Sequence, residues 1–168
     1  AIVSLEPEQR ERRDWVWARM GESPFAMTMT PLARLATLAS SVLSATSVES
    51  MANDYAAEDY RCDRAALEAL NASRLPADSA LIGRVVRSLY ETWLDGWGRR
   101  FQDLAAGPGK GLNELATPIA GEKDTCLLFA DGLRFDVGRM LAERLEARGY
   151  RVKVRHRIAP TPTVTATA

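Results

Sequence analysis

Apolar residues in the first two thirds of the chain recur every three or four positions. This pattern extends from Pro7 to about Gly107, in a stretch rich in Ala, Leu, Arg and Glu. It is the period of an amphipathic α-helix. The longest helix is predicted to begin near Asp78, a residue type that caps helix N-termini, and to end at Ala106. Its apolar stripe comprises Ile82, Val85, Leu89, Trp93, Trp97, Phe101 and Leu104.

Further helices are expected before this long one. Pro31 predicts the start of a second helix, because proline fits the first helical turn, where its missing N–H costs no hydrogen bond. The apolar face of this helix consists of Leu32, Leu35, Leu38, Ala39, Val42 and Leu43. Shorter helices are expected at residues 8–20, 48–57 and 63–70. Together these elements predict a helical bundle.

The pattern changes at Gly107, where the chain reads Gly-Pro-Gly-Lys-Gly111. Glycine and proline at this density are typical of a connection between structural units. We therefore predict a helical domain at residues 1–107, a connector at 108–123, and a second domain at 124–168 that is truncated at its C-terminus.

Residues 124–168 show the pattern of a β-α-β unit. A buried strand is predicted at residues 125–130, a helix at 134–148 and a second strand at 151–156. The helix places Val137, Leu141 and Leu145 on one face, as expected where it covers a sheet, and Gly149 is a typical helix stop. The predicted fold class is α+β by segment: mainly an α-helical bundle, followed by the first β-α-β unit of an α/β domain.

Composition and charge narrow the function classes. The 22 basic and 22 acidic residues cancel, so direct binding of nucleic acid or of an anionic membrane is not indicated. Cys62 and Cys126 lie far apart, which argues against a disulfide framework. The N-terminus does not resemble a signal peptide, and no apolar run is long enough to span a bilayer. A cytoplasmic location is therefore expected.

Candidate chemistry begins where the first predicted strand ends, at Asp131-Gly132. Ligands of open α/β sheets bind at the carboxyl ends of the strands. A carboxylate at that point can hold a divalent cation, and glycine lets the backbone turn closely. The alternative is that Asp131 caps the following helix. Arg134, in the first turn of that helix, either reaches a phosphate or pairs with Asp136, and the pattern leaves both open.

Hydroxyl side chains follow at residues 161–167, which read Thr-Pro-Thr-Val-Thr-Ala-Thr. One interpretation is a polar turn in which a threonine caps the next helix. The other makes one of these hydroxyls a nucleophile that is ionised by a metal and assisted by a helix dipole. The carboxylate of Asp131, one strand away, favours the second interpretation.

These motifs carry a resemblance. The turn Asp-Gly-Leu-Arg-Phe-Asp136, the predicted crossover helix and strand, and then Pro162-Thr-Val-Thr165 resemble the opening of the alkaline-phosphatase superfamily. Within it the chain is most similar to the PglZ family of the BREX bacteriophage-exclusion systems, which give phage resistance. The upstream helical stretch, with Asp14-Trp-Val-Trp and Tyr90-Glu-Thr-Trp, is also similar to that family.

The resemblance implies a metal-dependent phosphohydrolase of an antiviral defence system. It implies that Asp131 is a metal ligand and that Thr165 is the metal-bound catalytic nucleophile, with Thr163 as the fallback. The metal would be zinc, completed by Asp and His ligands downstream of this chain, so the chain alone is expected to be inactive. Arg134 is the candidate contact to the phosphoester substrate. The implied partners are a DNA methyltransferase and an ATPase of the defence complex.

Three other interpretations remain beside this one. The phosphatase-like part can be a non-catalytic scaffold, with the helical domain docking to partner proteins. A haloacid-dehalogenase-like phosphatase is disfavoured, because Leu133 stands where that family has a second Asp. Trp15, Trp17, Trp93 and Trp97 could stack on nucleic-acid bases, but their helical spacing favours a place in the core.

His156 is expected to be structural.

Overall fold

The computed structural model describes residues 1–21, 23–72, 76–107, 126, 128 and 130–159. The chain divides into two compact units. The first comprises Ala1–Ser44 and Asp59–Arg100, and the second comprises Ala45–Glu58 and Phe101–Ala168. The predicted connector at residues 108–123 lies outside the described residues, so the proposed domain boundary there stays a prediction.

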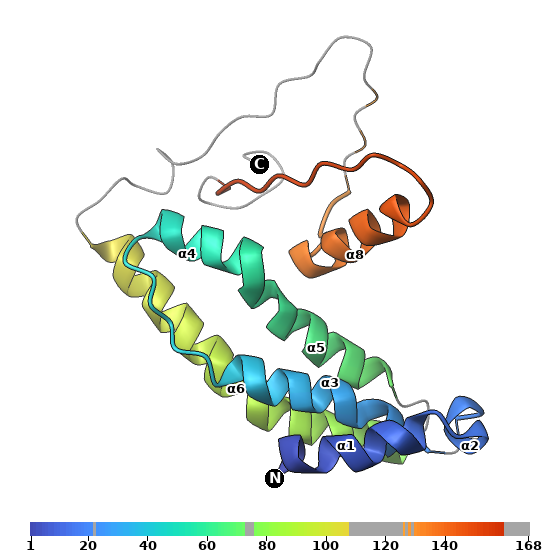
Figure 1. Ribbon diagram of the computed structural model, residues 1–168. Coiled ribbons are helices and arrows are strands. Elements are labelled where there is room, and N and C mark those ends of the chain that lie inside the picture. The colour runs from blue at the N-terminus through green and yellow to red at the C-terminus, as the bar shows by residue number, and fades with distance from the viewer. Residues whose placement is uncertain (22, 73–75, 108–125, 127, 129, 160–168) are drawn as a thin grey trace. The chain divides into compact units, whose positions relative to one another are not determined.

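The first unit consists of helices. α1 (Ile2–Arg13), α2 (Val16–Arg19), α3 (Pro24–Ala39) and α5 (Tyr60–Asn71) belong to it, together with most of α6 (Pro76–Ala106). α3 packs against α1 on one side and α5 on another (Figure 1). The predicted helical bundle is therefore present, with α3 as its central element.

Small and aliphatic side chains fill the core of this unit. Leu35 of α3 and Ala65 and Ala69 of α5 are 0% exposed, which lets these two helices approach closely. Ile82 and Trp93 on α6 are buried as the predicted stripe requires. Phe101, another member of that stripe, is 37% exposed.

The helices before α5 differ from the prediction in their ends. α3 begins at Pro24, so that Pro31 lies inside it, because residues 25–30 contain no helix breaker. α3 ends at Ala39, and Val42, expected on its apolar face, is 90% exposed. The predicted helix at residues 8–20 is broken at Trp15, whose backbone is extended.

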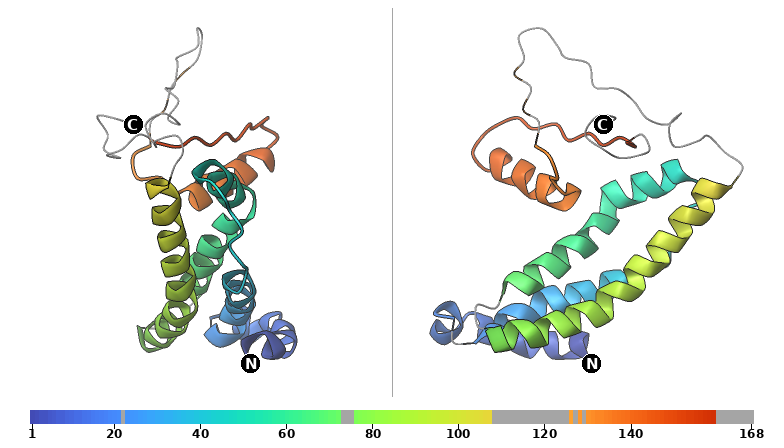
Figure 2. Two further views of the ribbon diagram at one scale, coloured as in Figure 1. Left: turned by 90° about the vertical axis from the view of Figure 1, so that its left-hand side faces the viewer. Right: turned by 180° about the vertical axis from the view of Figure 1, so that it is seen from behind.

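The second unit contains α4 (Val48–Asp54), the end of α6 and α8 (Phe135–Glu146). A π-helical turn (Tyr55–Asp59) follows α4, and all of it but Asp59 belongs to this unit. α4 begins with a capping box in which the Ser47 hydroxyl accepts from the Ser50 N–H at 3.0 Å. α8 lies within the helix predicted at residues 134–148. Figure 2 shows α8 from two further sides.

The end of α8 is a Schellman motif, as Gly149 indicates. Gly149 has φ +86°, a left-handed conformation that favours glycine. Its N–H donates to the Glu146 carbonyl at 2.8 Å, and the Tyr150 N–H donates to the Leu145 carbonyl at 3.1 Å. The backbone is thereby fixed where it leaves the helix.

The predicted β-α-β unit is wrong. The part of the chain that the structure describes contains no β-strand: residues 151–156 follow α8 without forming one, and Cys126, Leu128 and Ala130 of the other predicted strand are also irregular. Alternating valines can start a strand, but a strand exists only when another one pairs with its backbone, which a local pattern cannot guarantee. The helix was also expected to bury Leu141 against a sheet, and Leu141 is 50% exposed.

Among the described helices, none is long and apolar enough to cross a membrane.

Candidate functional site

The turn before α8 presents Asp131 to solvent. Asp131 and Gly132 form a turn in which Gly132 has φ +67°. The carboxylate of Asp131 is exposed and makes no hydrogen bond or ion pair with any described residue. The N-cap of α8 is Arg134, without a capping side chain. The alternative interpretation of Asp131, as the cap of this helix, is therefore wrong.

Arg134 and Asp136 form the second feature of the turn. Arg134 Nε donates to Asp136 Oδ1 at 3.0 Å, and Nη2 donates to Oδ2 at 3.2 Å. The Asp136 side chain is 0% exposed, whereas that of Arg134 is 53% exposed. The sequence left open whether Arg134 pairs with Asp136, and the structure shows the pair. Such a two-bond pair fixes the plane of a guanidinium and orients its outer edge.

Removal of Asp136 is expected to destabilise α8. Asp136→Ala deletes a buried carboxylate that lies in the first turn of a helix, where anions are favourable. The half-exposed Arg134 can be hydrated, so we expect a loss of about 2 kcal/mol in local stability. Amide hydrogen exchange of residues 139–146 measures it.

Two comparisons sharpen this prediction. Arg134→Ala is expected to cost more than Asp136→Ala, because it leaves a buried carboxylate without its partner. Glu146→Ala, at an exposed position of the same helix, is expected to leave exchange unchanged. Equal protection in Asp136→Ala and the unmodified protein would show that the pair does not stabilise the helix.

Contacts from α4 and from the π-helical turn after it reach the two flanks of α8 within the second unit. The rings of Tyr55 and Phe135 lie 5.6 Å apart between centroids. His156, after α8, is hydrogen-bonded through Nε2 to Asn53 Oδ1 at 3.0 Å. His156 was expected to be structural, and this bond to Asn53 gives it a structural partner. The contributions of Asn53 and Tyr55 were not foreseen, because a contact over a hundred positions leaves no local pattern.

The rest of the predicted site cannot be placed. Thr163 and Thr165 lie outside the described residues, so their roles stay predictions. Within the described residues there is no group of three or more His, Cys, Asp or Glu side chains that could hold a metal ion. Asp131 by itself can supply only one ligand. A metal site that includes it would need further ligands from residues outside those described.

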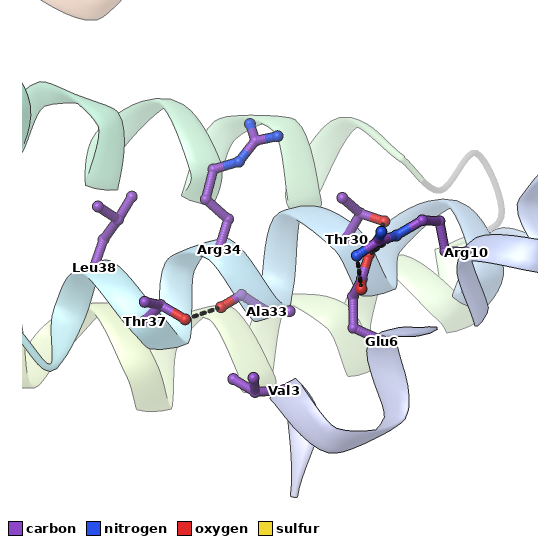
Figure 3. A pocket seen from close by; sticks show the side chains of 8 residues that line it. All are labelled: Val3, Glu6, Arg10, Thr30, Ala33, Arg34, Thr37 and Leu38. Atoms are coloured by element: carbon purple, nitrogen blue, oxygen red, sulfur yellow. Dashed lines mark hydrogen bonds and ion pairs between the residues drawn. The ribbon is translucent and has the colours of Figure 1, made fainter. Parts of the chain in front are cut away.

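A pocket of about 340 Å³ lies between α1 and α3 of the first unit (Figure 3). It is lined by Val3, Glu6, Arg10, Thr30, Ala33, Arg34, Thr37 and Leu38. Its polar groups already have partners: Glu6 accepts from Arg10 and from Thr30 Oγ1, the latter at 3.0 Å, and Arg34 pairs with Glu68 at 2.8 Å. The hydrogen bond from Arg10 holds the pKa of Glu6 below its usual range. The polar side chains named here thus bind one another and hold the helices together.

Polar groups also link α5 and α6. The Tyr90 hydroxyl donates to Asp63 Oδ1, and Trp97 Nε1 donates to Asp59 Oδ2 at 3.3 Å. Burial raises the pKa of the adjacent Cys62 thiol to about 12, and the neighbouring carboxylates add to the effect. A thiol with so high a pKa is a poor nucleophile at neutral pH. These hydrogen bonds hold α5 and α6 together.

Comparison with known proteins gives no match. No protein-family model, no curated protein and no solved structure matches this chain.

Proposed function

We propose that this chain is part of a PglZ-like, metal-dependent phosphohydrolase of a cytoplasmic bacteriophage-defence (BREX-type) system. The observation that carries the proposal is the turn before α8, where the exposed carboxylate of Asp131, which has no partner among the described residues, is followed three positions later by Arg134, whose guanidinium is held by Asp136. A carboxylate and a guanidinium in the same turn suit a site that binds a cation through the first and an anionic substrate through the second. The resemblance of the motifs at residues 131–136 and 162–165 supplies the reaction class.

Each side chain has a distinct role in this proposal. Asp131 holds a divalent cation, zinc in the implied family, together with Thr165 and ligands from beyond this chain. The cation lowers the pKa of a bound hydroxyl and stabilises charge on phosphoryl oxygens. Thr165, or Thr163 in its place, is the nucleophile toward the phosphoester. Arg134, oriented by Asp136, contacts a nonbridging phosphate oxygen.

Metal binding tests the role of Asp131. Because the remaining ligands are expected downstream, the measurement uses the longer protein that the resemblance implies. We expect Asp131→Asn to weaken zinc binding at least about tenfold. Even mutation of residues that only hydrogen-bond to metal ligands lowers metal affinity by about 10–100-fold. Asp103→Asn, which alters an exposed carboxylate of α6, is the matched control. Equal zinc affinity in both variants would remove Asp131 from the site.

A scaffold role is the second candidate, and one observation favours it. Trp15 and Trp17, expected in the core, are 57% and 64% exposed, and Val16 and Met20 beside them are 65% and 67% exposed. α2 is only four residues long, so it cannot bury this many large side chains. Exposed apolar clusters of this kind are typical of protein contacts. A methyltransferase or an ATPase of the defence complex are the partners implied by the resemblance.

A further inference from the structure

Positive charge is concentrated in the segment that leaves α8. Residues 148–157, here called the basic segment, contain five of the 22 Lys and Arg residues of the chain and none of its 22 Asp and Glu residues. His156 adds a further group that can carry positive charge. The rest of the chain therefore has seventeen basic and 22 acidic residues. The net charge of the whole chain is zero, but this segment alone is strongly cationic.

Four cations of this segment are available to an external anion. Arg148, Arg151, Lys153 and Arg155 are all exposed, and none of them makes an ion pair with a described residue. Helical arginines differ, since several pair with an acid one turn away, as Arg12 does with Glu8. Unpaired cations placed close together repel one another, and this repulsion is relieved when a polyanion binds.

The basic segment is drawn out between two fixed points. Figure 1 shows it as an open trace after α8, without coil or arrow. The Schellman motif at Gly149 fixes its start, and the hydrogen bond from His156 to Asn53 fixes its far part. Its exposed cations Arg151, Lys153 and Arg155 stand at every second position. In extended backbone such positions repeat about every 6.6 Å, which suits an anion that itself repeats along a line.

An aromatic ring stands at the start of this row. Tyr150 is 64% exposed, although its backbone N–H is held at the end of α8. An exposed ring next to a line of cations is the combination on which single-stranded nucleic acids bind, because bases stack while phosphates are neutralised. A membrane surface would be matched better by an amphipathic helix, whereas this segment is not helical and has only Val152 and Val154 between its cations.

We propose that the basic segment binds single-stranded nucleic acid, with Arg151, Lys153 and Arg155 against phosphates and Tyr150 stacked on a base. The chain-wide charge balance did not indicate direct nucleic-acid binding, because it averages over a segregated distribution. This proposal is independent of the proposed phosphohydrolase activity. Its test is made with EDTA present, so that no metal contributes.

The test measures fluorescence anisotropy of a labelled thymidine oligonucleotide titrated with the full chain at several salt concentrations. The variant R151Q/K153Q/R155Q is expected to bind more than about tenfold more weakly. The slope of the logarithm of the binding constant against the logarithm of the salt concentration is expected to become shallower by about two, at about 0.7 per lost phosphate contact on a single strand. Tyr150→Leu keeps every charge, and we expect roughly tenfold weaker binding with an unchanged salt slope.

A control separates this segment from net charge. R12Q/R19Q/R84Q removes the same charge from exposed helical positions and is expected to bind the oligonucleotide as the unmodified chain does. Far-UV circular dichroism checks that all variants are folded. Equal weakening in the control and the segment variant would overturn the proposal. So would binding to phosphatidylserine vesicles in place of the oligonucleotide, because the segment would then be a membrane contact.

Discussion

Leu35→Ala is expected to lower the free energy of unfolding by about 3 kcal/mol, within the 2–5 kcal/mol typical of buried leucines. Leu35 is 0% exposed and lies on α3, which packs against both α1 and α5. The truncation removes three buried side-chain carbon atoms and leaves a cavity that the flanking helices cannot fill. Urea denaturation followed by far-UV circular dichroism measures the change.

Leu81→Ala is the matched control for this prediction. It makes the same chemical change on α6, but Leu81 is 41% exposed. We expect it to cost no more than about 0.5–1 kcal/mol. If the two variants lost equal stability, α3 would not be the central element of the first unit.

The helical part of the fold could be predicted because its signal is local. The period identifies a helix around Ile82 and Trp93, and Gly149 marks the stop of another, although the first begins at Pro76 and not near the predicted cap Asp78. The ends of helices were less certain: both Pro24 and Pro31 can occupy a first turn, and only the packed structure shows which one does. Trp15 and Trp17 were misplaced because period alone does not say whether a partner helix covers them.

The second unit was predicted poorly because its pattern needs distant partners. Alternation at residues 151–156 suits a strand only where another strand supplies hydrogen bonds. The pair of Arg134 and Asp136 was one of two options in the sequence, and geometry alone distinguishes them. The contact between Asn53 and His156 has no sequence signature at all. Asp131 was predicted at the end of a strand, and the structure places it in a turn before α8 instead; its role as a metal ligand stays a prediction.

Loss of turnover on removing the nucleophile is the second large effect that we expect. In the longer protein that the resemblance implies, Thr165→Ala should lower zinc-dependent hydrolysis more than about a thousandfold, because the attacking oxygen is gone. Zinc binding should be reduced as well, since the same hydroxyl is a proposed ligand. Thr161→Ala removes a neighbouring hydroxyl without a proposed role and serves as the control.

The most direct test of the proposed function is therefore hydrolysis of a chromogenic phosphomonoester and phosphodiester by that protein, with zinc added, compared with its Thr165→Ala variant. We predict metal-dependent turnover of at least one ester in the unmodified protein and none above background in the variant. If Thr163→Ala abolished turnover instead, the nucleophile would be reassigned to that position. A zinc-loaded protein that hydrolysed neither ester would contradict the phosphohydrolase proposal and leave the scaffold role in its place.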